Sequence, residues 1–301
     1  MYSRILIPLD GSSTAEKVLP YVRYLTGNLK IPIELLAVVD IAETAAHLSA
    51  DTARFLDTLI EDGVRRCTIY LGRVAGTFPG SNAKISVERG RAEEAIIAKG
   101  ETDKAMLITM ATHGRSGLNR FLLGSIAEKV LRGTANPLLL VRATEGARSD
   151  GEATLKSIIV PLDGSELAES VLPMVAGLAK KLDLEIELFR AYHIPFSVYA
   201  GDENYFSANY DQLIDGVRDE ASEYLDKKAS ELKKLGVAKV SCVTKEGFAG
   251  DEIISLGQKT PDNLIAMCSH GRSGMRRWVL GSVAETVVRH SSGPVLITRP
   301  G

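Results

Sequence analysis

Short apolar runs alternate with longer amphipathic stretches along the first half of the chain. Runs this short and rich in branched residues are typical of buried strands, and here they cover residues 4–9, 33–39, 84–88, 105–109 and 138–141. Longer stretches with helical periodicity separate them, for example 52–71, and Ser13-Thr-Ala-Glu16 supplies a capping-box pattern for a helix to about Tyr24. This order predicts a parallel sheet flanked by helices.

The second half of the chain repeats the first. Ile7–Pro20 returns as Val160–Pro173, 153 positions later, and further strands are expected at 157–162, 185–191, 239–244, 264–267 and 295–298. Thr112–Arg142 returns as Ser269–Arg299, 157 positions later. The larger second offset predicts a small net insertion in the middle of the second copy, in a connection or a variable helix.

The chain length also favours two domains. A chain of 301 residues fits about two cores of ordinary size. Residues 143–153 are polar and contain glycine without an apolar period, which is typical of a linker. We therefore predict domains at 1–143 and 154–301, with the boundary near Gly151.

Each copy has a glycine-containing loop between its fourth strand and its last helix. Glycines let the backbone approach a ligand or adopt positive φ, and the first N–H groups of a helix are donors at its positive end. Such loops at the carboxyl ends of parallel strands predict an anion site. The loop and helix positions are Ala111, Gly114, Gly117, Gly124, Ser125 and Ile126 in the first copy, and Cys268, Gly271, Gly274, Gly281, Ser282 and Val283 in the second.

Structural interpretations of the same residues remain open. Ser125 with Glu128, and Ser282 with Glu285, fit capping boxes, and Asp10 and Asp163 each precede a glycine as turn carboxylates do. Other loop residues either contact phosphate or are merely solvated: His113, His270, Arg115, Arg120, Arg272, Arg276 and Arg277.

Composition and missing motifs narrow the function. The net charge of -2 provides no basic field for nucleic acid. The chain lacks the P-loop, the dinucleotide Gly-x-Gly-x2-Gly, the Gly-x-Ser-x-Gly elbow and the His-Glu-x2-His pair. Three scattered cysteines favour a reducing cytoplasm, and no apolar stretch has transmembrane length, so we expect neither nucleic-acid binding nor membrane insertion.

The Gly-x2-Gly-x9-Gly-Ser spacing, the Pro-Leu-Asp-Gly-Ser start and the closing Pro-Leu-Leu-Leu-Val strand resemble the universal stress protein family across nearly the whole chain. The resemblance implies an adenine-nucleotide alpha-hydrolase-like α/β fold, with two tandem open parallel five-stranded sheets ordered 3-2-1-4-5. It also implies ATP or AMP as ligand, with magnesium accompanying ATP.

By position, the resemblance assigns Asp10 and Asp163 to the adenosine and Val38 and Ala191 to the adenine pocket. It assigns Gly114, Gly124 and Ser125, with Gly271, Gly281 and Ser282, to the ribose and phosphates. The first glycine of the pattern is Ala111 in one copy and Cys268 in the other. The larger cysteine side chain predicts a weaker second site.

The resulting expectation is a cytoplasmic sensor or regulator of the stress response that hydrolyses ATP slowly, if at all. The resemblance further implies pairing of the fifth strands, ending at Val141 and Thr298, within the chain, and a homodimer is also expected. Two alternatives stay open: a nucleotide-independent interaction or dimerisation protein with structural glycine loops, and an enzyme of a related adenine-nucleotide fold.

Overall fold

The computed structural model describes residues 2–46, 53–78, 80, 83–112, 123–142, 149–193, 210–270 and 280–299. The chain folds into two compact units, built mainly from Met1–Thr154 and Leu155–Val295. Within the described part of the chain, no helix combines the length and the apolar character that crossing a bilayer requires.

The first unit contains a parallel sheet in the order β3-β2-β1-β4-β5. Central strand β1 pairs on both sides, with Ile5 opposite Ile33 and opposite Leu107. The parallel sheet agrees with the expectation from the sequence, and the strand order agrees with the one that the family resemblance implies. The strands are β1 (Ile5–Pro8), β2 (Ile33–Val39), β3 (Ala83–Arg89), β4 (Leu107–Ala111) and β5 (Leu138–Val141).

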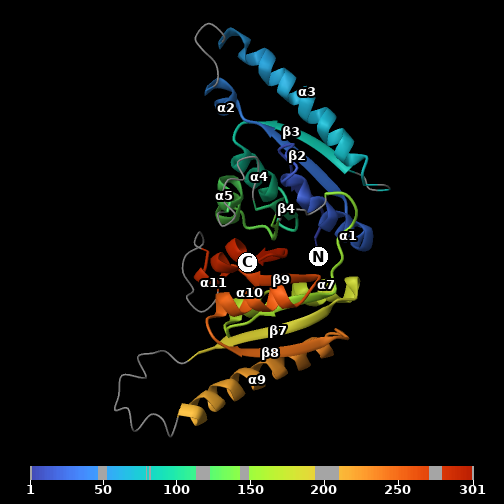
Figure 1. The fold of residues 1–301 in the computed structure, drawn as a ribbon. Coiled ribbons are helices and arrows are strands. Elements are labelled where there is room, and N and C mark those ends of the chain that lie inside the picture. Colours follow the sequence, from blue (N-terminus) through green and yellow to red (C-terminus); the bar gives the residue numbers. More distant parts are fainter. Residues whose placement is uncertain are drawn as a thin grey trace. The chain divides into compact units, whose positions relative to one another are not determined.

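Helices cover both faces of this sheet (Figure 1). Right-handed crossovers place α1 and α3 on one face, because the chain moves from β1 to β3 in one direction, and α4 and α5 on the other. The order reverses between β1 and β4, which is where ligands bind in open sheets. The helices are η1 (Ala15–Val18), α1 (Leu19–Leu29), α2 (Ile41–Ala46), η2 (Ala53–Phe55), α3 (Leu56–Ala75), α4 (Ala92–Glu101) and α5 (Ser125–Gly133).

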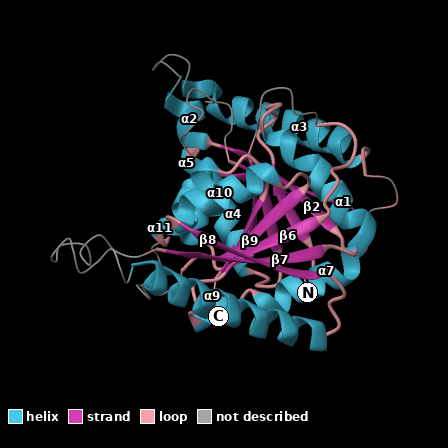
Figure 2. Ribbon diagram, turned by 60° about the horizontal axis from the view of Figure 1, so that its bottom comes forward, coloured by secondary structure: helices cyan, strands magenta, loops and turns pink. Residues whose placement is uncertain are grey.

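The second unit repeats this arrangement with the order β8-β7-β6-β9-β10. Its strands are β6 (Ser157–Pro161), β7 (Glu185–Tyr192), β8 (Val240–Glu246), β9 (Asn263–Cys268) and β10 (Val295–Thr298). Figures 1 and 2 show α7 and α9 on one side of these strands and α10 and α11 on the other. The helices are α6 (Glu166–Glu169), α7 (Leu172–Leu182), α9 (Tyr210–Lys234), α10 (Ala249–Lys259) and α11 (Ser282–His290).

Strand register locates the insertion in the second copy. Ile33 and Ile186 are equivalent at an offset of 153, whereas their partners on the third strands, Ala83 and Val240, differ by 157. The extra residues therefore lie between the second and third strands. The helix in this interval has 25 residues in the second unit and 20 in the first, which agrees with an insertion around a variable helix.

Several predicted boundaries were wrong by a few residues. The helix after β1 continues to Leu29, where Lys30 takes the left-handed conformation that ends it. Strand β4 starts at Leu107 because a turn holds the preceding residues, with Ala105 N–H bonded to Asp103 Oδ1 at 3.0 Å. The helix expected at 52–71 runs from Leu56 to Ala75. Such ends depend on local hydrogen bonds that apolar periodicity does not report.

The end of the predicted linker packs along α1. Arg23 donates from Nη1 to the carbonyl oxygens of Ser149 and Gly151 at 2.7 and 2.8 Å, and the N–H of Ala153 bonds to Pro20 O. The described part of this linker, residues 149–153, is therefore held on the surface of the first unit by its backbone.

Candidate functional site

An Asp-Gly turn follows the first strand of each unit. Gly11 and Gly164 have φ of 81° and 88°, a conformation that glycine adopts without steric cost. Oδ1 of Asp163 accepts hydrogen bonds from Ser165 N at 2.9 Å and Ser165 Oγ at 2.6 Å, and Asp10 makes the same pair with Ser12. The turn-carboxylate interpretation is therefore correct for Oδ1 of both residues.

The serine of each turn also starts the next helical segment. Ser165 Oγ accepts from the N–H of Ala168 at 3.2 Å, and Ser12 Oγ accepts from that of Ala15 at 3.1 Å. The capping box predicted at Ser13–Glu16 was therefore wrong: the N-cap of η1 is Thr14 without a side-chain cap, and Glu16 accepts a hydrogen bond from Tyr70 OH instead.

The capping boxes predicted at α5 and α11 are absent. Gly281 is the N-cap of α11, no side chain caps the helix, and Glu285 instead pairs with Arg289 at 2.9 Å. Glu128 pairs with Arg132 at 3.1 Å in the same way at α5, whose N-cap is Gly124. Because the serines begin these helices without capping them, the first N–H groups of each helix stay free of an intrahelical acceptor or a side-chain cap.

The glycine before each of these helices closes the loop by a backbone hydrogen bond, and at Gly281 the packing is tight. Gly281 N–H bonds to Ser269 O at 2.8 Å, and Gly124 N–H bonds to Thr112 O at 2.7 Å. A Cβ atom on Gly281 would lie 3.2 Å from Ser269 O. The φ values of Gly124 and Gly281, −60° and −64°, are ordinary, so neither glycine is explained by a positive φ.

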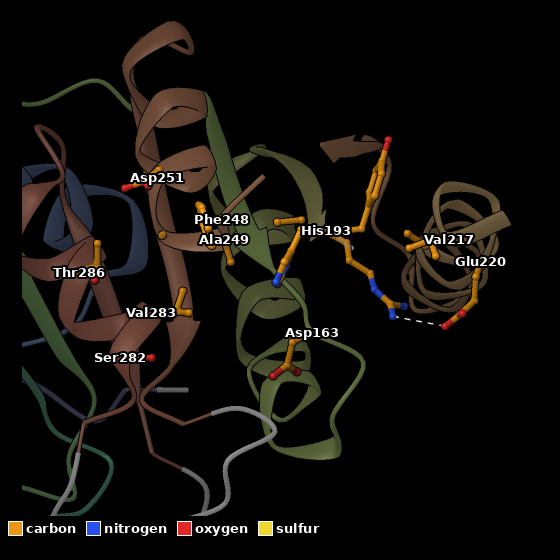
Figure 3. Close-up of a pocket in the computed structure, with 15 residues that line it drawn as sticks. Asp163, His193, Val217, Glu220, Phe248, Ala249, Asp251, Ser282, Val283 and Thr286 are labelled. Carbon is orange, nitrogen blue, oxygen red and sulfur yellow. Dashed lines mark ion pairs between the residues drawn. The ribbon is translucent and has the colours of Figure 1, made fainter. Parts of the chain in front are cut away.

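Two adjoining cavities lie at the carboxyl edge of the second unit. The inner one, of about 270 Å³, is bounded mainly by apolar side chains such as Leu162, Phe189 and Met267. The outer one, of about 630 Å³, extends toward α9 (Figure 3). The outer volume lies within the range of about 300–1,000 Å³ typical of small-molecule pockets, and the inner one lies just below it. The cavities share Asp163, Ala191, Ala249, Ser282 and Val283.

The structure brings together most of the residues predicted for the second site. The inner cavity is lined by Asp163, Ala191, Cys268, Gly281, Ser282 and Val283. His270 also lines it, and its Nδ1 lies 2.9 Å from Ser269 Oγ. Gly271 and Gly274 lie outside the described residues, as do Arg272, Arg276 and Arg277.

The first unit has its predicted residues at equivalent places. Asp10 follows β1, Val38 lies near the end of β2, Ala111 ends β4, and Gly124, Ser125 and Ile126 begin α5. Gly114, Gly117, His113, Arg115 and Arg120 lie outside the part of the chain that the structure describes.

Sequence reasoning missed the residues that line only the outer cavity. Arg190 and His193 come from the end of β7, and Phe248 precedes α10. The rings of His193 and Phe248 have centroids 5.5 Å apart with a 41° tilt. The corresponding residues of the first copy are Ala37, Asp40 and Arg91. The sequence signal that could have revealed the outer cavity is therefore the difference between the two copies at these positions.

A polar contact connects the first helical turn of each unit to its long helix. Tyr224 OH donates to Glu169 Oε1 at 2.8 Å, and Tyr70 OH donates to Glu16 Oε1 at 3.0 Å. Burial, and then the bond to Glu169, raises the pKa of Tyr224. This contact anchors α9 beside the outer cavity, where the Tyr224 ring lies 4.7 Å from the Arg190 guanidinium carbon.

Comparison with known proteins covers nearly the whole chain. The model of the universal stress protein family matches residues 1–142 and 154–299. A universal stress protein of Methanocaldococcus jannaschii is 29% identical over 150 residues, which span 50% of this chain and 85% of that protein. A universal stress protein of Mycolicibacterium smegmatis is 20% identical over 301 residues, covering 98% of this chain and 97% of its own.

Solved structures share the complete fold. A universal stress protein from Archaeoglobus fulgidus covers 100% of both chains with a TM-score of 0.70 at 20% identity. A protein of unknown function from Pseudomonas aeruginosa covers 99% of this chain and 93% of its own, with a TM-score of 0.65 at 17% identity. At these identities the likeness concerns the fold.

Proposed function

Because the chain belongs to the universal stress protein family, we propose that it binds an adenine nucleotide, ATP or AMP, at the carboxyl edge of each unit. The observation that carries this proposal is the convergence of Asp163, Ala191, Ser282 and Val283 on one cavity. These residues come from the ends of β6 and β7 and the start of α11, which only the folded chain brings together.

The cavity has separate places for the two ends of a nucleotide. Leu162, Phe189 and Met267 offer an apolar surface for a purine, with Ala191 beside them. Ser282, Val283 and Ala284 begin α11, so their N–H groups lack intrahelical acceptors and suit phosphate oxygens at the positive end of the helix. Phosphate binding here requires no basic side chain, which fits a chain of low net charge.

The arrangement favours binding over rapid chemistry. Helix N–H groups stabilise phosphate charge, but positioning alone does not activate a water molecule for attack. Among the described residues, no three histidine, cysteine or acidic side chains group as ligands for a metal ion. Magnesium would therefore enter with ATP, and we assign the protein the role of a cytoplasmic regulator whose contacts respond to nucleotide occupancy.

Isothermal calorimetry tests this proposal directly. Nucleotide-stripped full-length protein is titrated with ATP and magnesium and, separately, with AMP. We expect saturable heat for at least one nucleotide with a micromolar dissociation constant, about −8.2 kcal/mol. A stoichiometry near two would assign function to both units, whereas no binding of either nucleotide would overturn the proposal in favour of a nucleotide-independent interaction protein.

A further inference from the structure

The outer cavity of the second unit contains side chains that a mononucleotide in the inner cavity does not require. His193 and Phe248 form one side of it, Asp163 lies below, and Val217 and Glu220 of α9 form the other side (Figure 3). Because the two cavities share five lining residues, a ligand held in the inner cavity can continue directly into the outer one.

The inner lining is nearly the same in the two copies of the repeat. Conservation between copies indicates that both units retain the geometry for one common ligand part. The matched residues are Leu162, Ala249, Ile253 and Met267 in the second unit and Leu9, Ala92, Ile96 and Met110 in the first.

The outer lining differs between the copies. Arg190, Tyr192, His193 and Phe248 stand where the first unit has Ala37, Val39, Asp40 and Arg91. In the first unit, α3 lies so near β2 that a Cβ on Gly63 would be 3.2 Å from Val39 Cγ1. Tyr70 and Tyr224 make the same contact in the two units. Gly63 and Val217 each lie seven positions before their tyrosine, so Gly63 is the counterpart of Val217, which lines the outer cavity. The duplicated sites have therefore diverged at this end.

Phe248 is held in a position where its ring meets solvent. It is 71% exposed and lies beside His193. Gly247 before it has φ of 145° and bonds to Tyr192 O at 2.9 Å, while Gly90 in the first unit has φ of 125° and bonds to Val39 O at 3.0 Å. The backbone just before Phe248 therefore has the same conformation and hydrogen bond as the backbone just before Arg91. An exposed aromatic ring at a cavity mouth offers a stacking surface for a second base.

Arg190 adds a positive charge to the same cavity. Its side chain is only 11% exposed, and its Nη2 lies 3.5 Å from Oε1 of Glu220, whose side chain is 75% exposed. Such a long pair with an exposed partner is weak, so a phosphate can displace Glu220 from the guanidinium. The outer cavity therefore combines a cation with a stacking surface.

We propose that the second unit binds a dinucleotide, an adenine nucleotide joined through phosphates to a second nucleoside whose base stacks on Phe248 and His193. This inference rests on the proposed nucleotide binding of the same cavity. The first unit, with Asp40 and Arg91 at these places, takes a mononucleotide.

Calorimetric titrations of the stripped full-length chain with AMP and with diadenosine triphosphate test this. Unmodified protein should bind the dinucleotide at one site per chain at least about tenfold more tightly than AMP, which corresponds to about 1.4 kcal/mol. Phe248→Ala should remove this preference and leave AMP affinity unchanged, whereas Phe248→Tyr should keep it. Arg91→Ala, the matched change in the first unit, should alter neither the AMP affinity nor the dinucleotide affinity of the first unit.

The outcomes separate the two proposals. Equal dinucleotide affinity in Phe248→Ala and unmodified protein would overturn the dinucleotide inference while AMP binding stands. Failure of both ligands to bind unmodified protein would overturn the proposed function and this inference together. Because Phe248 is largely exposed, thermal unfolding of the alanine variant should match that of unmodified protein, which excludes misfolding as the cause of a loss.

Discussion

At the scale of the residue, one carboxylate serves both local structure and the cavity. Asp163 Oδ1 holds the turn through Ser165, and the same residue lines both cavities of the second unit. The positive φ of Gly164 turns the chain so that Asp163 lies at the end of β6. The turn and ligand interpretations of this aspartate are therefore compatible, because the turn fixes where the carboxylate lies.

Cys268 should weaken AMP binding in the second unit. Cys268 is 4% exposed and lines the inner cavity, and its Sγ lies 3.8 Å from Ser170 Oγ. The first unit has the smaller Ala111 at the corresponding position. Cys268→Ala should tighten AMP binding at the second site about tenfold, the effect of one small group in a pocket. Calorimetry should show the converse weakening for Ala111→Cys, and equal affinities at the unmodified sites would contradict the prediction.

Glu34 should make stability depend on pH. This carboxylate is 1% exposed and lies 3.1 Å from Arg4, 3.3 Å from Lys84 and 3.0 Å from Lys99. Burial alone would raise its pKa, but hydrogen bonds from Ser86, Lys99 and Lys84 lower it from 4.5 to about 2. The carboxylate therefore stabilises the fold above pH 4.5, and this contribution, roughly 3 kcal/mol, is lost as the pH falls toward 2.

Urea unfolding between pH 2 and 7 measures this contribution. Glu34→Gln should lower the unfolding free energy at pH 7 and flatten its decline in acid. Glu187→Gln is the matched control, because burial and then Glu185 raise the pKa of Glu187 and its charge destabilises the fold as the pH rises. An unchanged acid profile for Glu34→Gln, with the same free energy at pH 7, would show that the buried cluster contributes nothing.

At the scale of the element, the site depends on how α11 begins. Its N-cap is a glycine without a side-chain cap, and the same holds for α5. A serine cap would have stabilised each helix but would have occupied the donors that face the cavity. The hydrogen bond from Gly281 N–H to Ser269 O instead fixes the position of the first turn of α11.

Replacing Gly281 with valine should remove binding at the second site. The added Cβ would lie 3.2 Å from Ser269 O and 3.7 Å from His270 Cα, so either Ser269 or the first turn of α11 must shift by a few tenths of an ångström. In calorimetry, AMP stoichiometry should fall from two to one per chain. Gly177→Val is the control, because nothing lies within 4 Å of its added Cβ, and an unchanged stoichiometry for Gly281→Val would rule out a role for this closure.

At the scale of the whole molecule, some elements around the proposed site are the same in both copies of the repeat, and others differ. The first strand, its Asp-Gly turn and the start of the last helix recur in both units, while the segment between the second and third strands differs in length and in its side chains. If both proposed sites bind, their difference would let one chain respond to two ligands.

Pairing of the fifth strands within the chain stays a prediction, which a charge in β5 tests. Leu139 is buried in β5, so Leu139→Asp should disrupt that strand and expose amides of its expected partner. Hydrogen exchange at residues 295–298 should then accelerate. Leu6→Ala, a buried change in β1, should leave exchange at 295–298 unaffected, and equal exchange in both variants would contradict the pairing.

The sequence by itself determined the two copies, the α/β class and the strand positions. Central strands of a parallel sheet are buried on both faces, so β1 and β6 read as continuous apolar runs, and repetition made them stand out. The positions of Asp163 and Ser282 at the cavity were also predictable, because their motifs recur in both copies, whereas Ala191 was assigned through the family resemblance alone. Helix ends were less predictable, since a turn at Asp103 or a left-handed Lys30 depends on single hydrogen bonds.

Only the tertiary structure decided which residues meet at the cavity. Arg190 and His193 at the end of β7 and Phe248 before α10 belong to no motif, and the sheet brings these two segments together because the carboxyl ends of parallel strands share one edge. It also decided how closely Gly281 approaches Ser269 O, since that contact joins residues 12 positions apart through the fold. Periodicity reports which face of an element is buried, but contacts between elements depend on their packing.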